Sequence, residues 1–294
     1  MLARCSRFIW TSGKRFRYGS PQSEFPYLYD FFAEQIDIVK TALLSTAILT
    51  AWASFVCVSA AADFQVTTQI FRGNARIPAV TYQTVFQGTK VYDVVTTPPR
   101  QVTIIDYDSG QITLLDPQRS VKLILTTQNV LQHSTYFKSH GTFPEGPLWT
   151  FLRDPKFETN YNPQNQVLKL AGDPLTYEAD VTKIENQPIV VDYARFCDWS
   201  CLLNFICAGS DLPQARMELN SQIRAKGAVP AEVRKTIRHA DPTKSISLRS
   251  THEYHWKLQE DDTKLVQSIQ ADLEKANAVS FDEYVKPAFV APQK

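Results

Sequence analysis

The sequence predicts an α+β fold: a curled antiparallel β-sheet, or half-barrel, with helices packed in and around its concave face. Three observations predict it. Short runs rich in Val, Ile, Thr and Leu follow one another between residues 63 and 127, and turn-forming residues divide them about every ten positions. Apolar side chains alternate onto both faces of these runs. An almost wholly apolar segment of helical length then follows at 192–209.

The composition is that of an ordinary globular protein. Of the 294 residues, 44% are hydrophobic and 21% are charged. The formal net charge is +1, so no overall electric field attracts nucleic acid or anionic lipid. We therefore expect no nucleic-acid partner.

Residues 1–62 are interpreted as a leader. No charged residue occurs in 41–62, and this run ends in the small side chains that signal peptidase accepts. Basic residues precede the run, which places residues 63–294 outside the cytoplasm, in the periplasm or the extracellular space. Cys57 follows Val56 where lipid attachment requires a small residue, so we expect no lipoprotein.

Two alternatives to a cleaved signal peptide stay open. The run over 41–62 is long enough to span a bilayer, and as an uncleaved anchor it would attach the protein to a membrane. A buried globular helix is the third interpretation. We expect residues 63–294 to form a single α+β domain with a helical insertion at about 192–238.

The first part of this domain predicts an antiparallel meander. Asp108-Ser109-Gly110 fits a three-residue hairpin loop, and Asp116-Pro117 fits a type I turn. Together with Asp106 these carboxylates could support acid–base chemistry, but Gly110 and Pro117 favour a turn role for Asp108 and Asp116. The expected strands are 63–71, 80–87, 90–97, 102–108, 111–116 and 121–127.

Pairing across residues 108–110 assigns side chains to faces. One face receives Ile104, Ile112 and Leu114, and the other receives Ile105, Tyr107 and Leu115. Because both faces carry apolar groups, we expect a sheet that is covered on both sides or curled around something.

The rest of the chain mixes helices and strands. Segment 192–209 is apolar almost all round, which predicts a buried helix. Pro213 and Gly227 delimit an amphipathic helix over 212–227, and Ser280 to Glu283 fits the capping box of a short last helix. Further helices are expected at 127–141, 230–238 and 261–278, and further strands at 157–163, 166–172, 175–184 and 245–258.

Residues with catalytic or metal-binding chemistry form no recognisable motif. His252 and His255 would point to opposite faces of a strand, so they cannot chelate one ion. Cys197 and Cys201 share one helical face; buried thiols, a disulfide and a metal site are the interpretations, in that order. We identify no catalytic residue, no metal site and no cofactor signature.

Two stretches carry a resemblance. VYDVV…VTIIDYDSGQITLLDPQRSVKLIL and MELNSQIRAKGAVPAEVRKTIR resemble an uncharacterised exported bacterial family with the half-barrel arrangement of the lipoprotein carriers LolA and LolB. The resemblance spans residues 63 to about 285, and the helical block at 192–238 departs from it. It implies an apolar ligand cavity, to which we assign Ile104, Leu114, Leu123, Phe137, Tyr254 and Trp256.

Three functions follow, in order of preference. The first is an exported, non-catalytic binding or carrier protein for a lipid or another apolar ligand of the cell envelope. The second is a structural or protein-interaction module of the envelope whose core is filled by its own helices. The third is an envelope hydrolase that uses Asp106 and the histidines near Trp256.

Overall fold

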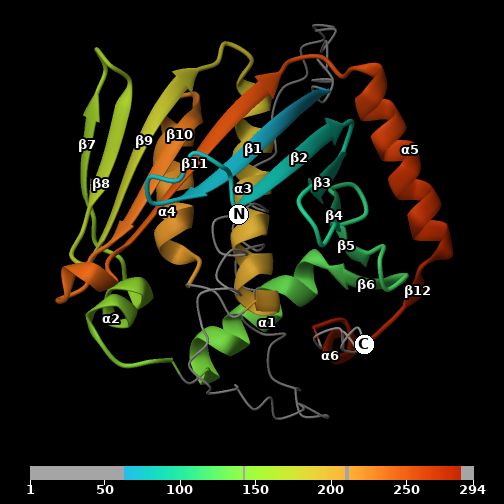
Figure 1. The fold of residues 1–294 in the computed structure, drawn as a ribbon, viewed down its shortest axis with the longest axis horizontal. Helices are drawn as coiled ribbons and strands as arrows, with labels where there is room; N and C mark the ends of the chain where they lie inside the picture. Colours follow the sequence, from blue (N-terminus) through green and yellow to red (C-terminus); the bar gives the residue numbers. More distant parts are fainter. Residues whose placement is uncertain (1–62, 142, 209–211, 286–294) are drawn as a thin grey trace, which may run out of the picture. The chain divides into compact units, whose positions relative to one another are not determined.

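The computed structural model describes residues 63–141, 143–208 and 212–285 (Figure 1). The predicted leader lies outside the described residues. By their contacts, the described residues all fall in one compact unit. None of the described helices combines the length and the apolar character needed to cross a membrane.

One sheet of twelve strands organises the described part of the chain. Its order is β12-β6-β5-β4-β3-β2-β1-β11-β10-β9-β8-β7, so β1 and β11 pair in the middle although they are far apart in sequence. Among the described strands only β12 pairs in parallel, with β6; the other neighbouring strands pair antiparallel. The strands are β1 (Phe64–Arg72), β2 (Val80–Gln87), β3 (Lys90–Val95), β4 (Gln101–Asp106), β5 (Gln111–Asp116), β6 (Val121–Thr126), β7 (Glu158–Asn162), β8 (Val167–Ala171), β9 (Leu175–Lys183), β10 (Ala228–Ile237), β11 (Ile246–His255) and β12 (Asn277–Ala278).

Turn residues set the meander of β1–β6. Gly88 has a φ of +56° between β2 and β3, and Gly110 has a φ of +63° between β4 and β5. Glycine adopts this left-handed region without the steric cost of a Cβ atom. Before β6, the Asp116 carboxylate accepts a hydrogen bond of 3.1 Å from the backbone N–H of Arg119. The antiparallel strands predicted between 63 and 127 are confirmed.

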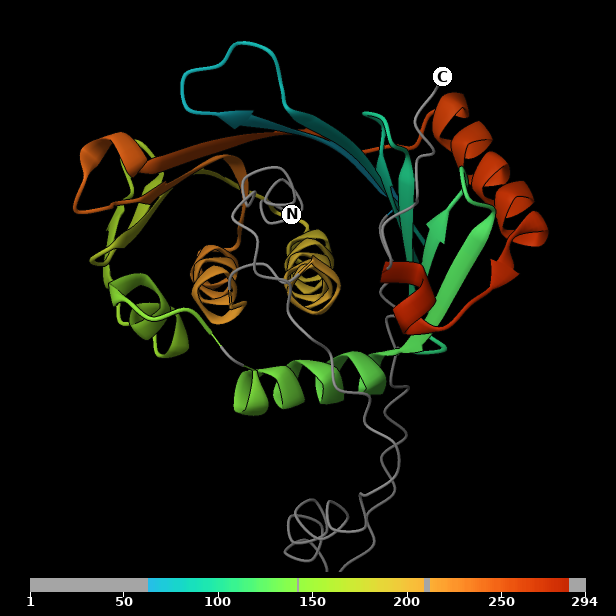
Figure 2. The same ribbon diagram turned by 60° about the horizontal axis from the view of Figure 1, so that its bottom comes forward.

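Helices pack on both sides of the curled sheet. On the concave side, α3 (Gln187–Ala208) and α4 (Gln214–Ala225) lie next to each other, and α1 (Thr127–His140) crosses the open side (Figure 2). On the outward face, α5 (Glu260–Lys275) covers the first half of the sheet. The shorter helices are α2 (Pro147–Arg153), α6 (Phe281–Val285) and a 3₁₀ turn at Pro242–Lys244. The predicted α+β half-barrel is confirmed.

The two largest apolar clusters lie on opposite faces of the sheet. The inner cluster joins the concave face to α1, α3 and α4, and it includes Ile105, Ile112 and Leu114. The outer cluster lies between β2–β5 and α5; its buried members are Val85, Tyr92, Val94, Val102, Ile104, Leu115, Val266, Ile269 and Ala276. The expectation of a sheet covered on both faces therefore holds for this half.

The predicted face assignment between β4 and β5 is wrong by one residue. Ile105 stands opposite Ile112, and Asp106 opposite Gln111, so the loop has four residues, 107–110, and not three. Shifting the register of one strand by one residue moves its side chains to the other face. Ile104 therefore lies in the outer cluster, away from Leu114.

The predicted helix at 230–238 is wrong as well. Residues 230–237 belong to β10, which pairs with β9 and β11. A bulge between Pro230 and Glu232 interrupts the alternation of side chains, and the inward position 235 holds a buried lysine. These two features hide the strand pattern, whereas Val233 and Ile237 are spaced as in a helix. The helical block thus ends at Ala225.

Candidate binding site between the sheet and its helices

Helix α3 occupies the concave side of the sheet. It has apolar residues around its whole circumference, as the sequence predicts, and every residue from Ser200 to Ile206 is buried. Phe205 contacts two aromatic rings from other segments, Phe137 at 6.3 Å and Phe143 at 6.4 Å between ring centroids. Burial of a helix on all sides requires apolar neighbours in every direction.

Aromatic rings connect this interior to the surface. Phe64 of β1 stacks on Phe86 of β2 with ring centroids 4.1 Å apart, and Phe86 meets Phe196 of α3 edge-on at 5.6 Å. At the end of β11, Tyr254 stacks on Trp256 at 5.1 Å. Trp256 is 44% exposed, so one end of the aromatic series reaches solvent.

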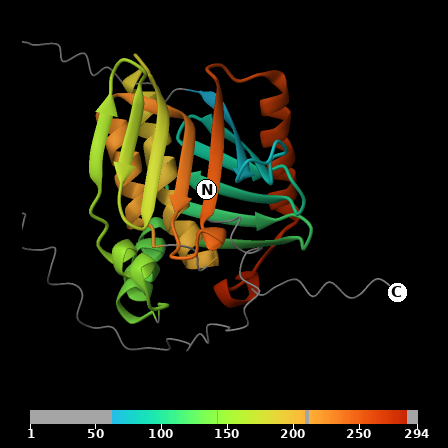
Figure 3. The same cartoon turned by 60° about the vertical axis from the view of Figure 1, so that its left-hand side comes forward.

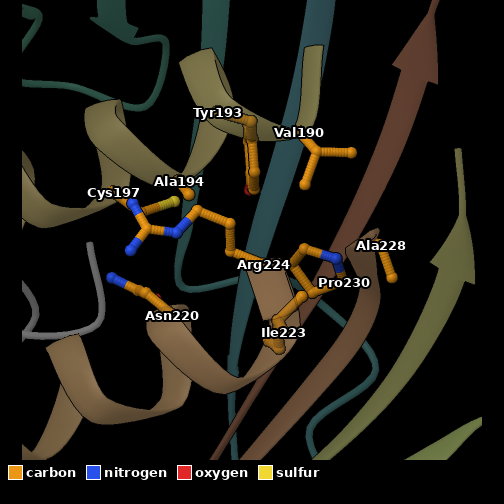
Figure 4. A pocket seen from close by; sticks show the side chains of 9 residues that line it. All are labelled: Val190, Tyr193, Ala194, Cys197, Asn220, Ile223, Arg224, Ala228 and Pro230. Atoms are coloured by element: carbon orange, nitrogen blue, oxygen red, sulfur yellow. The ribbon is translucent and has the colours of Figure 1, made fainter. Parts of the chain in front are cut away.

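A small pocket lies between α3, α4 and the start of β10 (Figure 4). Its volume is about 10 Å³, which is room for about one water molecule. Most of its lining is apolar, and Asn220 and Arg224 of α4 bring polar groups to one end. The lining residues are Val190, Tyr193, Ala194, Cys197, Asn220, Ile223, Arg224, Ala228 and Pro230.

A polar chain joins α4 to α3 beside this pocket. The Arg216 Nε atom donates to Asn220 Oδ1 at 3.0 Å, and Asn220 Nδ2 donates to Asp198 Oδ1 at 2.8 Å. Burial raises the pKa of Asp198; the hydrogen bond from Asn220 and the charges of Arg224 and Arg216 oppose this rise. The carboxylate is thus held in place by Asn220 without a direct ion pair to either arginine among the described residues.

His252 forms a buried hydrogen-bonded cluster between α3 and the sheet. Its Nδ1 atom lies 2.9 Å from the Tyr193 hydroxyl and 3.1 Å from the Thr68 hydroxyl, and its Nε2 atom lies 3.0 Å from the Ser250 hydroxyl. Burial, with a smaller contribution from the positive charge of Arg216, lowers the pKa of His252 to about 3. The imidazole is therefore neutral at pH 7, with one nitrogen donating and one accepting.

Cys197 and Cys201 are buried free thiols. Residues four apart on a helix have Cβ atoms about 5–6 Å apart, whereas a disulfide needs about 3.8 Å. The α-helical geometry of α3 is therefore incompatible with a disulfide between Cys197 and Cys201, the second of the three interpretations. Burial raises the pKa of Cys197 to about 12, so this thiol is protonated and unreactive at neutral pH.

The structure brings together most of the residues assigned to a cavity. Leu114 and Leu123 belong to the inner cluster, and Phe137 and Tyr254 are partly buried against it. Trp256 stacks on Tyr254 at the exposed end. Ile104 is on the outward face and does not meet them.

The polar residues in and beside the pocket were not predicted from the sequence. Arg216, Asn220 and Arg224 are spaced by four, which places them along one face of α4. This repeat was visible in the sequence, but an amphipathic helix normally turns such residues toward solvent. Their position beside α3 depends on the packing of the two helices, which the sequence pattern does not specify.

The residues suggested for a hydrolase do not form a site. Asp106 accepts hydrogen bonds from the backbone N–H groups of Asp108 and Ser109, so it stabilises the turn. His252 faces the interior while its near neighbour His255 is exposed. Across the described ranges, no group of three or more His, Cys, Asp or Glu residues is placed to hold a metal ion.

Comparisons with known proteins show a distant structural likeness. No family model matches the sequence, and no curated protein matches it. Among solved structures, the chain is similar to a LolA superfamily protein from Nitrosomonas europaea, with 9% sequence identity and a TM-score of 0.27. The match covers 69% of this chain and 89% of that chain.

Proposed function

We propose that the protein is an exported, non-catalytic binding protein for a ligand with an apolar chain, such as a lipid of the cell envelope. The observation that supports this proposal most is the pocket between α3, α4 and β10, which has apolar walls and one polar end. The ligand chain enters along the apolar side chains of both helices. Hydrophobic transfer of the chain from water supplies the binding free energy, about 0.8 kcal/mol for each buried CH₂ group.

The size of the pocket sets a requirement on binding. About 10 Å³ holds one water molecule, so an acyl chain fits only after α4 moves away from α3 and the sheet. α4 contributes few buried apolar side chains, among them Ala215, Leu219 and Ile223, so moving it exposes less apolar surface than moving α3 would. We therefore propose that α4 is the element that moves.

Extraction of the purified protein tests this proposal. The full chain, prepared without detergent from a bacterial host, is extracted with organic solvent and the extract is analysed by mass spectrometry. We expect a lipid or fatty acid in near-stoichiometric amount, and its loss in Ala194→Phe, because a ring at this lining position fills the pocket. Leu131→Phe on the exposed side of α1 is the matched control. Equal extracts from both variants, or an empty wild-type protein, would contradict the proposal.

Export is part of the same proposal. Residues 41–62 carry the pattern of a signal peptide, with small residues at their end. Amino-terminal sequencing of the exported protein should find a start close to Asp63. If the mature chain began at residue 1 and sedimented with membranes, residues 41–62 would be a membrane anchor and not a signal peptide.

A second candidate is a protein-interaction module of the envelope. The observation that favours it is that α3 fills the concave side, with residues 200–206 all buried. On this hypothesis the interior is only a folding core and the protein binds partners through its surface. This second candidate would be favoured if the protein bound no acyl ligand and if the Ala194→Phe variant kept the function of the wild-type protein.

A further inference from the structure

We infer that the polar end of the α3–α4 pocket is a subsite for an anionic head group, a carboxylate or a phosphate, with Arg224 as its principal contact. This inference rests on the proposed function, since it names the class of ligand: an amphiphile with one apolar chain and one anionic end. Asn220 and Arg216, about one and two turns back along α4, complete the subsite.

The direction of the Arg224 side chain supports this subsite. Arg224 lines the pocket but is itself exposed, so its charge is accessible from solvent. In Figure 4 its guanidinium group extends beneath α3 toward the Asn220 amide and Cys197. Among the described residues no carboxylate forms an ion pair with it. Its planar set of donors therefore remains available to a carboxylate or a phosphate, which it can bind through two hydrogen bonds.

The charge around the subsite also favours an anion. Arg216 uses Nε for Asn220, and no other hydrogen bond of its guanidinium group is found in the described part of the chain. Asp198 is the carboxylate of this cluster, and Asn220 holds it. Two guanidinium groups against one carboxylate leave net positive charge, which attracts an anion.

The other charged groups of the two helices have partners of their own. Arg195 of α3 lies over the Tyr107 ring at 3.8 Å, and Asp192 interacts with it. Glu218 of α4 accepts a hydrogen bond from Gln222, and Lys226 lies 5.1 Å from the centre of the Tyr161 ring. These groups do not cancel the positive charge at Arg224.

The apolar walls next to the Arg224 guanidinium group favour a ligand that also has an apolar chain. Val190, Ala194 and Ile223 form apolar walls, and Ala228 and Pro230 close the far end. A free inorganic anion would use only the arginine, whereas an anionic amphiphile uses both ends of the pocket. The arrangement therefore favours a fatty acid or a phosphate-bearing single-chain lipid.

Binding of three probes to the full chain tests this inference: hexadecanoate, hexadecanol and inorganic phosphate, measured by titration calorimetry. We expect hexadecanoate to bind at least tenfold more tightly than hexadecanol, and phosphate alone to bind too weakly to measure. Arg224→Gln should weaken hexadecanoate about tenfold, the loss of a charged hydrogen bond, and should not change hexadecanol. Arg224→Lys should recover part of the loss. Arg195→Gln on α3 is the matched control and should change neither affinity.

Each alternative result contradicts a specific claim, either the anionic subsite or the proposed function. Equal affinity for hexadecanoate and hexadecanol, or no effect of Arg224→Gln, overturns the anionic subsite and leaves the proposed function standing. Tight binding of phosphate alone overturns the amphiphile in favour of a free anion. If neither hexadecanoate nor hexadecanol binds, the proposed function itself fails.

Discussion

The two halves of the sheet present the same kind of concave face but different outward faces. On β2–β5 the outward face is apolar, and α5 covers it. On β9–β11 the outward face carries charges, and none of the described helices lies over it (Figure 3). There Arg234 pairs with Glu178 at 2.8 Å and with Asp180 at 3.0 Å, and Arg249 pairs with Glu232 at 3.2 Å.

The difference follows from the pattern of side chains. In β4 and β5 four consecutive residues are buried, so both faces need an apolar cover. In β9 buried and half-buried residues alternate, so one face can stay in water. The sheet therefore needs α5 over one half only, and the concave face is the feature that both halves share. This comparison predicts different responses to substitution on the two outward faces.

The largest effect is expected at Leu115 on the covered outward face. Its side chain is 0% exposed in the outer cluster, so Leu115→Ala leaves a cavity against α5. We expect a loss of about 3 kcal/mol in the free energy of unfolding, measured by urea denaturation. Glu178→Ala at an outward position of β9 should lose less than about 1 kcal/mol. Similar losses at both positions would show that the outward faces do not differ in this way.

Acid should lower the free energy of unfolding through His252, which links α3 to the middle of the sheet. The pKa of His252 is about 3 in the folded protein and about 6.5 in an unfolded chain. Because the unfolded chain binds the proton more readily, this contribution to stability is complete above pH 6.5 and is lost as the pH falls toward 3. We expect a loss of about 1.4 kcal/mol per pH unit in that window from this residue.

His252→Asn removes the titrating group and serves as the comparison. Between pH 6.5 and pH 4.5 (roughly the upper part of the window), the wild-type protein should lose more unfolding free energy than the variant. Parallel curves for the two proteins would mean that His252 titrates in the folded protein as it does in the unfolded chain. The variant also loses the hydrogen bond to Tyr193, which lowers its stability at every pH without changing the slope.

The helix that covers the outward face depends on one buried carboxylate. Asp262 is 4% exposed at the start of α5; its side chain accepts hydrogen bonds from the Gln259 backbone N–H at 2.8 Å and from Gln83 at 2.9 Å. Asp262→Ala removes a helix cap and leaves buried donors unpaired, so we expect a loss of about 2 kcal/mol in urea denaturation. Its neighbour Asp261 is exposed, and Asp261→Ala should have almost no effect.

The sequence was sufficient for the features that depend on local pattern. Gly88, Gly110 and Asp116 identified the meander, and the apolar circumference of 192–209 identified the buried helix. It was insufficient where one residue of loop length decided the face, as at 107–110, which moved Ile104 outward. It also failed at β10, where a bulge and an inward lysine mask the alternation.

The candidate site was less accessible from the sequence than the fold. The apolar residues Leu114, Leu123 and Phe137 could be assigned to the interior because strand and helix periodicity fixes their faces. Arg224 and Asn220 could not, because their place beside Cys197 and Ala194 depends on how α4 packs against α3. The angle and position of two packed helices depend on how their side chains fit together, and hydrophobic periodicity does not specify that fit.

The smallest effect is expected in the charged outward face. Arg234 and its carboxylate partners are each 20–42% exposed by side chain, so solvent weakens their attraction. Arg234→Met keeps the aliphatic stem and should lower the free energy of unfolding by less than about 1 kcal/mol at low salt. At about 1 M NaCl the difference from wild type should shrink further, because screening shortens the reach of these charges to about 3 Å. A loss as large as that of Leu115→Ala would mean that the charges stabilise this half as firmly as α5 stabilises the other, and the contrast between the two outward faces would then be one of chemistry alone.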